Sequence, residues 1–227
     1  MLYVAVSFTG NSPYRHNIPS VSGRTLKQEN ILDYAAGSDL DNSPKTRIFI
    51  TNRLGFPVRY IYGFSSDGFS YFLSVQKRST VRSSSYGSKL IRVCQKDVNF
   101  SSYTEIPIDC KGSANSRRFP LAQAAYLGRA GRALAGSVEN TDEYEDILYV
   151  TFSTASSYGS DAAGGDSALC AYSMQDVRKK FQENIRNCMN GLGRRGLDFI
   201  KRDAPCVKSV CIRFLLQCQN QFSCPIK

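Results

Sequence analysis

The sequence has no tryptophan, only one histidine (His16), and no CxxC pair among its eight cysteines. Structural zinc sites use closely spaced cysteines and histidines, so most zinc arrangements are excluded. No run of about eighteen apolar residues is present, which leaves no candidate for a membrane-spanning helix. Residues 1–6 lack the basic start and the long apolar core of a secretion signal, and their pattern is typical of a strand. We therefore expect no zinc module, signal peptide or membrane anchor in this chain.

Signatures of catalysis are also missing, since the chain has no GxSxG, HExxH or phosphate-loop motif. Residues 191–196 match GxGxxG, but a dinucleotide site needs that motif between a strand and a helix, and here it follows a predicted helix. A nucleophilic triad would have to recruit His16 from an irregular loop. A run of carboxylates beside a predicted strand is typical of a solvated surface: Asp142, Glu143, Glu145 and Asp146. We expect no enzyme activity and no cofactor.

Basic residues exceed acidic ones, giving a formal net charge of +10. They are scattered, without a block of five or more lysines and arginines. This distribution favours a solvated basic surface over a nucleic-acid site. We therefore expect no nucleic-acid partner, and a basic secreted enzyme or polyanion-binding module stays open as an alternative of another class.

The eight cysteines are many for a cytosolic protein of 227 residues. They indicate disulfides formed in an oxidising, extracellular setting. Asn99 begins the sequon Asn-Phe-Ser, which predicts a glycosylation site in a loop between two strands.

Aromatic and β-branched residues concentrate between residues 58 and 110. They form four short runs, the first two separated by the tight-turn sequence Ser-Ser-Asp-Gly. Four strands in about fifty residues, joined by hairpin-like loops, have the size of one β-propeller blade. The predicted strands are residues 58–64, 69–76, 89–95 and 103–108.

The rest of the chain alternates strands with loops and one helix. We expect further strands at residues 2–8, 48–52, 121–127, 146–153 and 167–173, with a loop or short turn at 128–136 and a flexible loop at 156–167. The alanine-rich segment 121–127 has helix propensity, but sheet context dominates such short runs. Ser173 and Asp176 form a capping-box pattern that predicts a helix over 174–187, lying against the outside of a blade. Its apolar stripe consists of Val177, Phe181 and Ile185.

Four runs of the chain, in order, resemble the sema domain of plexins and their growth-factor-receptor relatives: YFLSVQKRS, KLIRVCQKD, SYTEIPIDC and SALCAYSMQDVR. This resemblance covers residues 2–209. It implies an all-β fold, a seven-bladed propeller of which the chain holds parts of about three blades, with one short outer helix. Because that is less than half of such a domain, we interpret the chain as a fragment of a longer receptor.

The resemblance also implies a function. Plexins are plasma-membrane receptors whose extracellular propeller binds a semaphorin, with a co-receptor or a plexin homodimer as further partners of the parent protein. A semaphorin-type ligand is the alternative among binding proteins. The family places semaphorin contacts on loops in the region of residues 14–47, where the candidate partner-binding residues are Arg15, His16, Arg24, Lys45 and Arg47.

The resemblance further implies two disulfides, Cys110 to Cys170 and Cys188 to Cys206. Cys94 is expected to bond a cysteine further downstream, and its partner stays open among Cys211, Cys218 and Cys224.

The resemblance ends after Ser209. We therefore divide the chain into a partial sema domain, residues 1–209, and a non-homologous tail, residues 210–227. The tail is interpreted as translated intron or a mis-predicted exon, with a genuine alternative terminus as the competing explanation.

Overall fold

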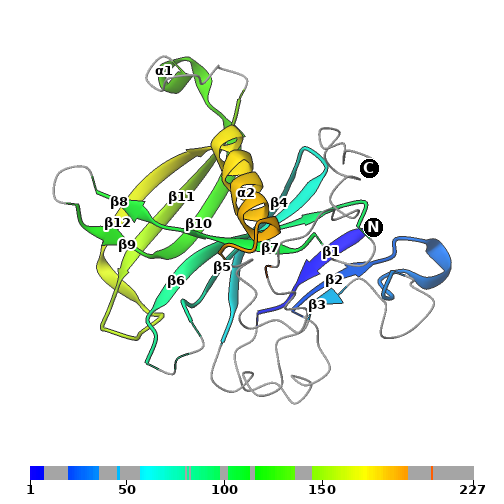
Figure 1. Ribbon diagram of the computed structural model, residues 1–227, viewed down its shortest axis with the longest axis horizontal. Helices are drawn as coiled ribbons and strands as arrows, with labels where there is room; N and C mark the ends of the chain where they lie inside the picture. The colour runs from blue at the N-terminus through cyan, green and yellow to red at the C-terminus, as the bar shows by residue number, and fades with distance from the viewer. Residues whose placement is uncertain are drawn as a thin grey trace.

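The described residues of the computed structural model form three antiparallel sheets, a two-stranded ladder and one long helix, α2 (Figure 1). The sheets follow one another along the chain, so each strand pairs with a neighbour in sequence. The structure describes residues 1–7, 20–35, 45–46, 57–79, 81, 83–97, 102–112, 116–135, 145–193 and 206.

The first sheet has the order β1-β2-β3. The expected strand over residues 2–8 is shorter than predicted, because pairing with β2 ends at Ala5. A 3-10 turn, η1 (Gln28–Asn30), follows β2, and the predicted strand at residues 48–52 lies outside the described residues. The strands are β1 (Leu2–Ala5), β2 (Val21–Arg24) and β3 (Lys45–Thr46).

The second sheet is the predicted four-stranded blade, with the order β4-β5-β6-β7. Asp67 and Gly68 connect β4 to β5 with φ angles of 49° and 75°. Two consecutive left-handed residues form the hairpin turn whose twist matches that of the strands, so the tight-turn prediction is confirmed. The strands are β4 (Arg59–Ser66), β5 (Phe69–Lys77), β6 (Tyr86–Cys94) and β7 (Thr104–Ile108).

The third sheet has the order β10-β11-β12. The alanine-rich segment is a strand, as predicted, because β10 pairs with β11 along its length. A short ladder, β8 (Cys110–Lys111) and β9 (Arg118–Phe119), precedes it. The strands are β10 (Leu121–Arg129), β11 (Asp146–Ala155) and β12 (Ala163–Ser173).

Two loop predictions in this region are partly wrong. A five-residue helix, α1 (Gly131–Ala135), occupies most of the predicted loop at 128–136. Strand β12 begins at Ala163, inside the predicted loop at 156–167, because it pairs with the extended end of β11. At Gly164 a Cβ atom would lie 2.4 Å from the Thr154 hydroxyl. Gly164 therefore permits the close approach of β11 and β12.

The central blade is buried on both faces. Tyr71 and Leu73 of β5 belong to a core shared with β10, β11 and α2, whereas Phe72 belongs to a second core with Val21 of β2. Side chains alternate between the faces of a strand, so β5 supplies both cores. The three sheets therefore stack face to face, as successive blades of a propeller do.

Helix α2 (Met174–Met189) begins at the predicted residue. The Ser173 hydroxyl accepts a hydrogen bond from the Asp176 amide at 3.3 Å. The carboxylate that completes the cap is that of Glu145, which accepts from the Ser173 hydroxyl and, at 3.1 Å, from the Gln175 amide. Glu145 is distant in sequence from the helix, so the capping-box pattern does not reveal it.

Val177 and Phe181 of α2 are buried. The Phe181 ring lies 6.0 Å from that of Tyr71, edge to face. The helix contacts β7, the outer strand of the blade, and also β11 and β12 (Figure 1). It therefore spans the junction of two sheets.

The GxGxxG match begins where α2 ends. Gly191 has a φ of 75°, and the Leu192 amide donates to the Asn187 carbonyl at 2.8 Å. A left-handed glycine with this hydrogen bond is a helix stop. The glycines that the structure describes in this motif thus terminate a helix, whereas a dinucleotide site requires them to begin one.

Candidate functional site

The candidate partner-binding residues fall largely outside the described part of the chain. Arg15, His16 and Arg47 lie outside the described residues, and Lys45 begins β3, opposite Ser22. Arg24, at the end of β2, is the member of the set whose side chain the structure describes.

The Arg24 guanidinium is held by its own loop. Its Nε donates to the Ser22 hydroxyl and its Nη1 to the Leu32 carbonyl, both at 3.2 Å. The guanidinium carbon lies 3.7 Å from the centre of the Tyr34 ring, a cation–π distance. Arg24 therefore stabilises the described part of the loop that follows β2, and it acts as a positioning residue for that segment.

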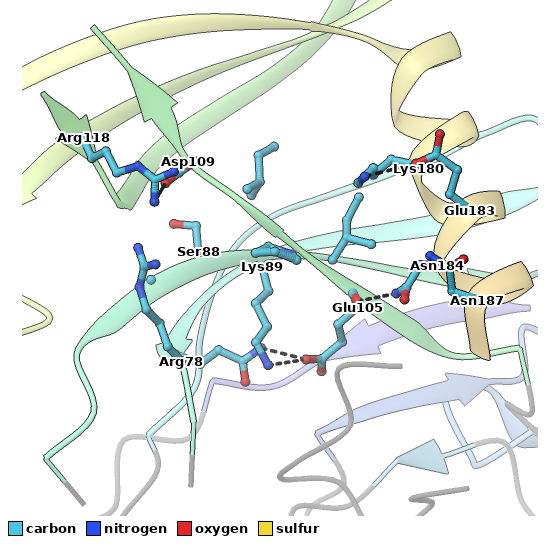
Figure 2. A pocket seen from close by; sticks show the side chains of 15 residues that line it. Arg78, Ser88, Lys89, Glu105, Asp109, Arg118, Lys180, Glu183, Asn184 and Asn187 are labelled. Carbon is cyan, nitrogen blue, oxygen red and sulfur yellow. Dashed lines mark hydrogen bonds and ion pairs between the residues drawn. The ribbon is translucent and has the colours of Figure 1, made fainter. Parts of the chain in front are cut away.

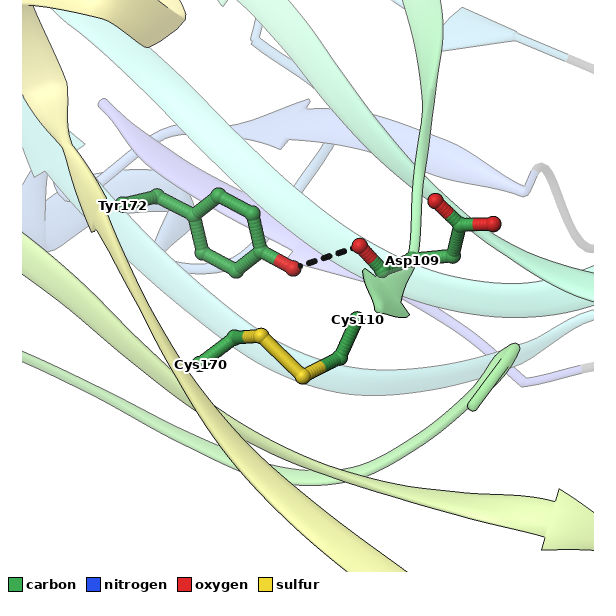
Figure 3. The surroundings of a disulfide bond; sticks show 4 residues. All are labelled: Asp109, Cys110, Cys170 and Tyr172. Atoms are coloured by element: carbon green, nitrogen blue, oxygen red, sulfur yellow. Dashed lines mark hydrogen bonds between the residues drawn. A yellow bond between two sulfur atoms is a disulfide. The ribbon is translucent and has the colours of Figure 1, made fainter. Parts of the chain in front are cut away.

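The disulfides join distant parts of the fold. Cys110, at the end of the central blade, bonds Cys170 of β12 with a Cα–Cα distance of 5.8 Å (Figure 3). Beside this bond the Tyr172 hydroxyl donates to the Asp109 carbonyl at 2.8 Å (Figure 3). Burial, followed by the charge of Asp109, raises the pKa of the Tyr172 phenol. The central blade and the third sheet are thus linked covalently and by a hydrogen bond.

Cys188 of α2 bonds Cys206 with a Cα–Cα distance of 4.4 Å. Cys94 is also disulfide-bonded, and its partner lies outside the described residues. Each cysteine within the described part of the chain therefore takes part in a disulfide.

A buried ion pair joins strands β6 and β7 of the central blade. Lys89 Nζ lies 2.8 Å from Glu105 Oε2, and the Glu105 side chain is 1% exposed. The same carboxylate accepts from Gln76 Nε2 at 3.3 Å and from the Tyr103 hydroxyl at 2.9 Å. Burial, with the Glu105 carboxylate close by, raises the pKa of the Tyr103 phenol well above its usual value. Three donors thus satisfy a carboxylate that would otherwise be costly to bury.

A cavity of about 600 Å³ opens beside this pair, between β7 and α2 (Figure 2). Two of its cations pair with carboxylates, Arg118 with Asp109 at 3.5 Å and Lys180 with Glu183 at 3.1 Å. Arg78 Nε donates instead to the Tyr86 carbonyl at 3.3 Å. A cavity with both signs of charge does not select an anion. It is lined by Gln76, Arg78, Gly87, Ser88, Lys89, Glu105, Ile106, Pro107, Ile108, Asp109, Arg118, Lys180, Glu183, Asn184 and Asn187.

The polar groups of this cavity serve the fold. The Ser88 hydroxyl donates to the Pro120 carbonyl and accepts from the Ala122 amide, both at 2.8 Å. The Glu105 carboxylate accepts hydrogen bonds from Gln76, Lys89 and Tyr103. Both groups therefore hold strands of the fold together. Within the described residues, no group of three or more histidine, cysteine or acidic side chains could hold a metal ion.

Comparisons with known proteins identify the fold. The family model described as "Sema domain" matches residues 122–225. The chain is 36% identical over 221 residues to human Plexin-A4 and 31% identical over 224 residues to mouse Plexin-A2. A solved structure of the Plexin A4 full extracellular region superposes with a TM-score of 0.78 and 27% identity, over 99% of this chain and 25% of that chain.

The chain is homologous to the plexins. It is an all-β, partial sema propeller, as the four quoted runs predict. The alignments cover 90% of this chain against Plexin-A4 and 92% against Plexin-A2, and in each case 11% of the relative. The chain therefore spans about a ninth of the length of these curated relatives. The sema match runs to residue 225, beyond the predicted boundary at residue 209. The boundary at residue 209 stays a prediction.

One buried residue of this plexin sema segment was not singled out from its sequence. Arg92 of β6 is 1% exposed. Its guanidinium carbon lies 4.3 Å from the Phe69 ring centre and 4.6 Å from that of Phe181. Its Nε and Nη1 atoms have no hydrogen-bond partner within the described chain, and burial lowers the pKa of the group. The available signal was a charged residue inside the apolar run LIRVC.

Arg92 connects α2 to the central blade through these two rings. An arginine between aromatic faces gains cation–π attraction, which partly offsets the cost of burying the charge.

No helix that the structure describes is long and apolar enough to cross a membrane.

Proposed function

We propose that this chain is part of the ligand-binding propeller of a plexin-like receptor, exposed outside the cell, and that its ligand is a semaphorin. The single observation that carries the proposal is the similarity to plexins along nearly the whole chain, with a TM-score of 0.78 against a plexin extracellular region. The semaphorin ligand comes from the family resemblance. The chain contributes binding and catalyses no reaction.

The stacked blades suit this role physically. Sheets that share cores and a disulfide form a rigid scaffold on which loops are presented. Arg24 shows how one such loop is held in place by polar contacts of its own. Recognition would rest on shape and charge complementarity over a broad patch. The net charge of +10 favours an acidic face on the partner.

A binding assay with both partner classes tests the proposal. The secreted chain is immobilised, and semaphorin ectodomains and plexin ectodomains are passed over it separately. Binding of at least one semaphorin is the expected result. Plexin binding alone would instead support the semaphorin-type ligand, and binding of neither class would overturn the proposal for this chain.

A salt series addresses the polyanion alternative. A complex formed by patch complementarity loses less affinity with salt than a non-specific polyanion complex, which weakens steeply. Heparin serves as the probe in parallel with the semaphorin.

We also propose that Asn99 is a glycosylation site. Glycosidase treatment should then reduce the mass of the secreted chain, and the Asn99→Gln variant should show no such loss.

The division at residue 209 remains a proposal of its own. Transcripts spliced directly after the Ser209 codon would support a translated intron in the tail. Abundant reads continuing through the codon for Lys227 to a stop would show that residues 210–227 are a genuine terminus.

A further inference from the structure

The connection between β10 and β11 carries the only pair of arginines that lie three positions apart in the sequence, Arg129 and Arg132. They enclose Ala130 and Gly131, and together these four residues form the end of β10 and the start of α1. Both arginines are exposed, and so is Ala133, which follows them. Figure 1 shows α1 beyond the end of the third sheet, projecting away from the other labelled elements. The arginine pair is therefore presented at a protruding tip of the molecule.

The fold holds this tip weakly. Helix α1 has five residues, none of them buried, and a helix shorter than about 12 residues depends on tertiary packing for its stability. Gly131 begins the helix with a φ of 68°, in the left-handed region, so the chain turns sharply away from β10. On the strand side, the Ala130 amide donates to the Glu145 carbonyl at 3.0 Å. Opening α1 to an extended chain therefore exposes little buried surface.

The setting of the chain supplies an agent that recognises such a pair. Its disulfides indicate the oxidising secretory pathway. Subtilisin-like serine endoproteases of that pathway hold two arginines in carboxylate-lined pockets. One arginine precedes the cut directly, and the other lies three residues earlier. A guanidinium and a carboxylate form strong, charge-assisted hydrogen bonds in such a pocket.

We propose that an endoprotease of this class cleaves the chain between Arg132 and Ala133, with Arg129 in its second arginine pocket. Water is the co-reactant. The bond between the Arg132 carbonyl carbon and the Ala133 nitrogen breaks, the carbon gains the hydroxyl group of water, and the nitrogen gains its proton. The proposal rests on secretion of the chain and is independent of its semaphorin ligand.

The adjacent arginines Arg117 and Arg118 show why the α1 pair is selected. The residue three positions before Arg118 is Asn115, so the second pocket would receive no arginine. The Arg117 carbonyl also accepts from the Gly112 amide at 2.8 Å, and Arg118 belongs to β9, which pairs with β8 beside the Cys110 disulfide. A protease needs an extended segment that can leave its own fold, so a strand held in a ladder is protected.

The fold keeps the two pieces together after the cut. The cut falls between Cys110 and Cys170, so their disulfide joins residues 1–132 to residues 133–227. The β10–β11 ladder also remains, because its pairing ends at Arg129, before the cut. The cleaved protein is therefore a two-chain molecule with a disulfide between its chains and a new amino terminus in α1.

Two measurements on the 227-residue chain test the proposal: secretion from cells, and incubation of the purified chain with a purified endoprotease of this class. The cleaved protein should run as one species without reduction and as two after reduction, with one new amino terminus at Ala133. Arg129→Ala and Arg132→Ala should each reduce the cleaved fraction by about tenfold or more, because each removes a charge-assisted pair with the enzyme. The control Arg117→Ala should be cleaved like wild type, and circular dichroism checks that every variant is folded.

A relocated arginine pair tests the role of α1. Tyr126→Arg combined with Arg132→Ala moves the pair three positions earlier, into β10, where both positions pair with β11. Tyr126 is 66% exposed, so the relocated pair stays at the surface. This variant should remain intact, because the ladder prevents the strand from entering the enzyme. A wild-type chain that stays intact in both measurements, a new amino terminus other than Ala133, undiminished cleavage of Arg132→Ala, or cleavage at the relocated pair would overturn the proposal.

Discussion

The central blade and the third sheet are both built from alternating strands, yet their surroundings differ. The blade β4–β7 has a core on each face, whereas the sheet β10–β12 has a core on one face and solvent on the other. Their outer edges differ as well. The edge strand β7 contains Pro107, and Asn184 of α2 donates to the Glu105 carbonyl on that strand at 3.3 Å. Strand β12 is 11 residues long and contains neither proline nor lysine.

This difference shows what burial on two faces requires. In β5 the polar residues Ser74 and Gln76 are as buried as their apolar neighbours. Each has a hydrogen-bond partner: Ser74 donates to the Lys89 carbonyl at 3.4 Å and Gln76 to Glu105 at 3.3 Å. Buried polar groups are tolerated when they are paired. In the third sheet, the outward hydroxyls of Tyr149 and Thr151 donate to the Arg129 and Ala124 carbonyls at 3.1 and 3.3 Å, close to the surface.

The largest expected effect comes from removing one partner of the buried ion pair in the central blade. Glu105→Ala leaves Lys89 buried without its carboxylate, and removal of one partner of a buried ion pair costs about 3–5 kcal/mol. Urea unfolding of the secreted chain measures this loss. Glu183→Ala is the control, because its pair with Lys180 is exposed and worth less than about 1 kcal/mol. Equal effects of the two variants would contradict the assignment of a buried pair.

The next prediction concerns the disulfide that links the central blade to the third sheet. Cys110→Ser removes the bond to Cys170, which closes a sequence separation of 60 residues. Loss of a disulfide of this loop length costs about 4 kcal/mol on the chain-entropy model. Secretion yield should fall far more than in Arg117→Ala, whose ion pair with Asp166 is exposed. Peptide mapping without reduction checks the pairing, and an unlinked Cys110 in an otherwise oxidised chain would contradict it.

A matched pair of leucines compares the faces directly. Leu73 of the central blade is 0% exposed, whereas Leu169 of the third sheet is 67% exposed. Leu73→Ala should cost about 2–5 kcal/mol through lost burial and the cavity left behind. Leu169→Ala should change monomer stability by less than about 0.5 kcal/mol. Urea unfolding of the secreted chain measures both changes, and similar losses at both positions would contradict the difference in burial.

The smallest effect concerns the contact between β1 and the central blade. Burial, followed by the charge of Asp97, raises the pKa of the Tyr3 phenol to about 12, and its hydroxyl donates to the Gln95 carbonyl at 3.1 Å. The folded state therefore keeps a proton that the unfolded state loses above pH 10, the ordinary tyrosine value. Stability should fall as the pH rises from 10 towards 12. Urea titrations across this range should show a shallower fall in Tyr3→Phe, and an unchanged slope would contradict the role of Tyr3.

Local pattern accounts for most of the elements. Alternating aromatic and β-branched residues, with Asp67 and Gly68 between them, predict the hairpin of β4 and β5 because that turn matches the twist of paired strands. Ser173 and the apolar stripe of Val177 and Phe181 predict α2 from the helical period alone. These are short-range effects, so the sequence determines them by itself.

The tertiary structure decided which faces of those strands are buried. Alternation has the same period in β5 and in β11, and burial depends on which sheets lie beside each strand. Glu145 at the α2 N-terminus and Arg92 between Phe69 and Phe181 likewise depend on residues far away in sequence. The candidate ligand-binding residue Arg24 is held by Leu32 and Tyr34 across a loop turn that its own neighbours do not specify. Long-range packing creates these contacts, because a side chain's partners are fixed only when distant segments meet.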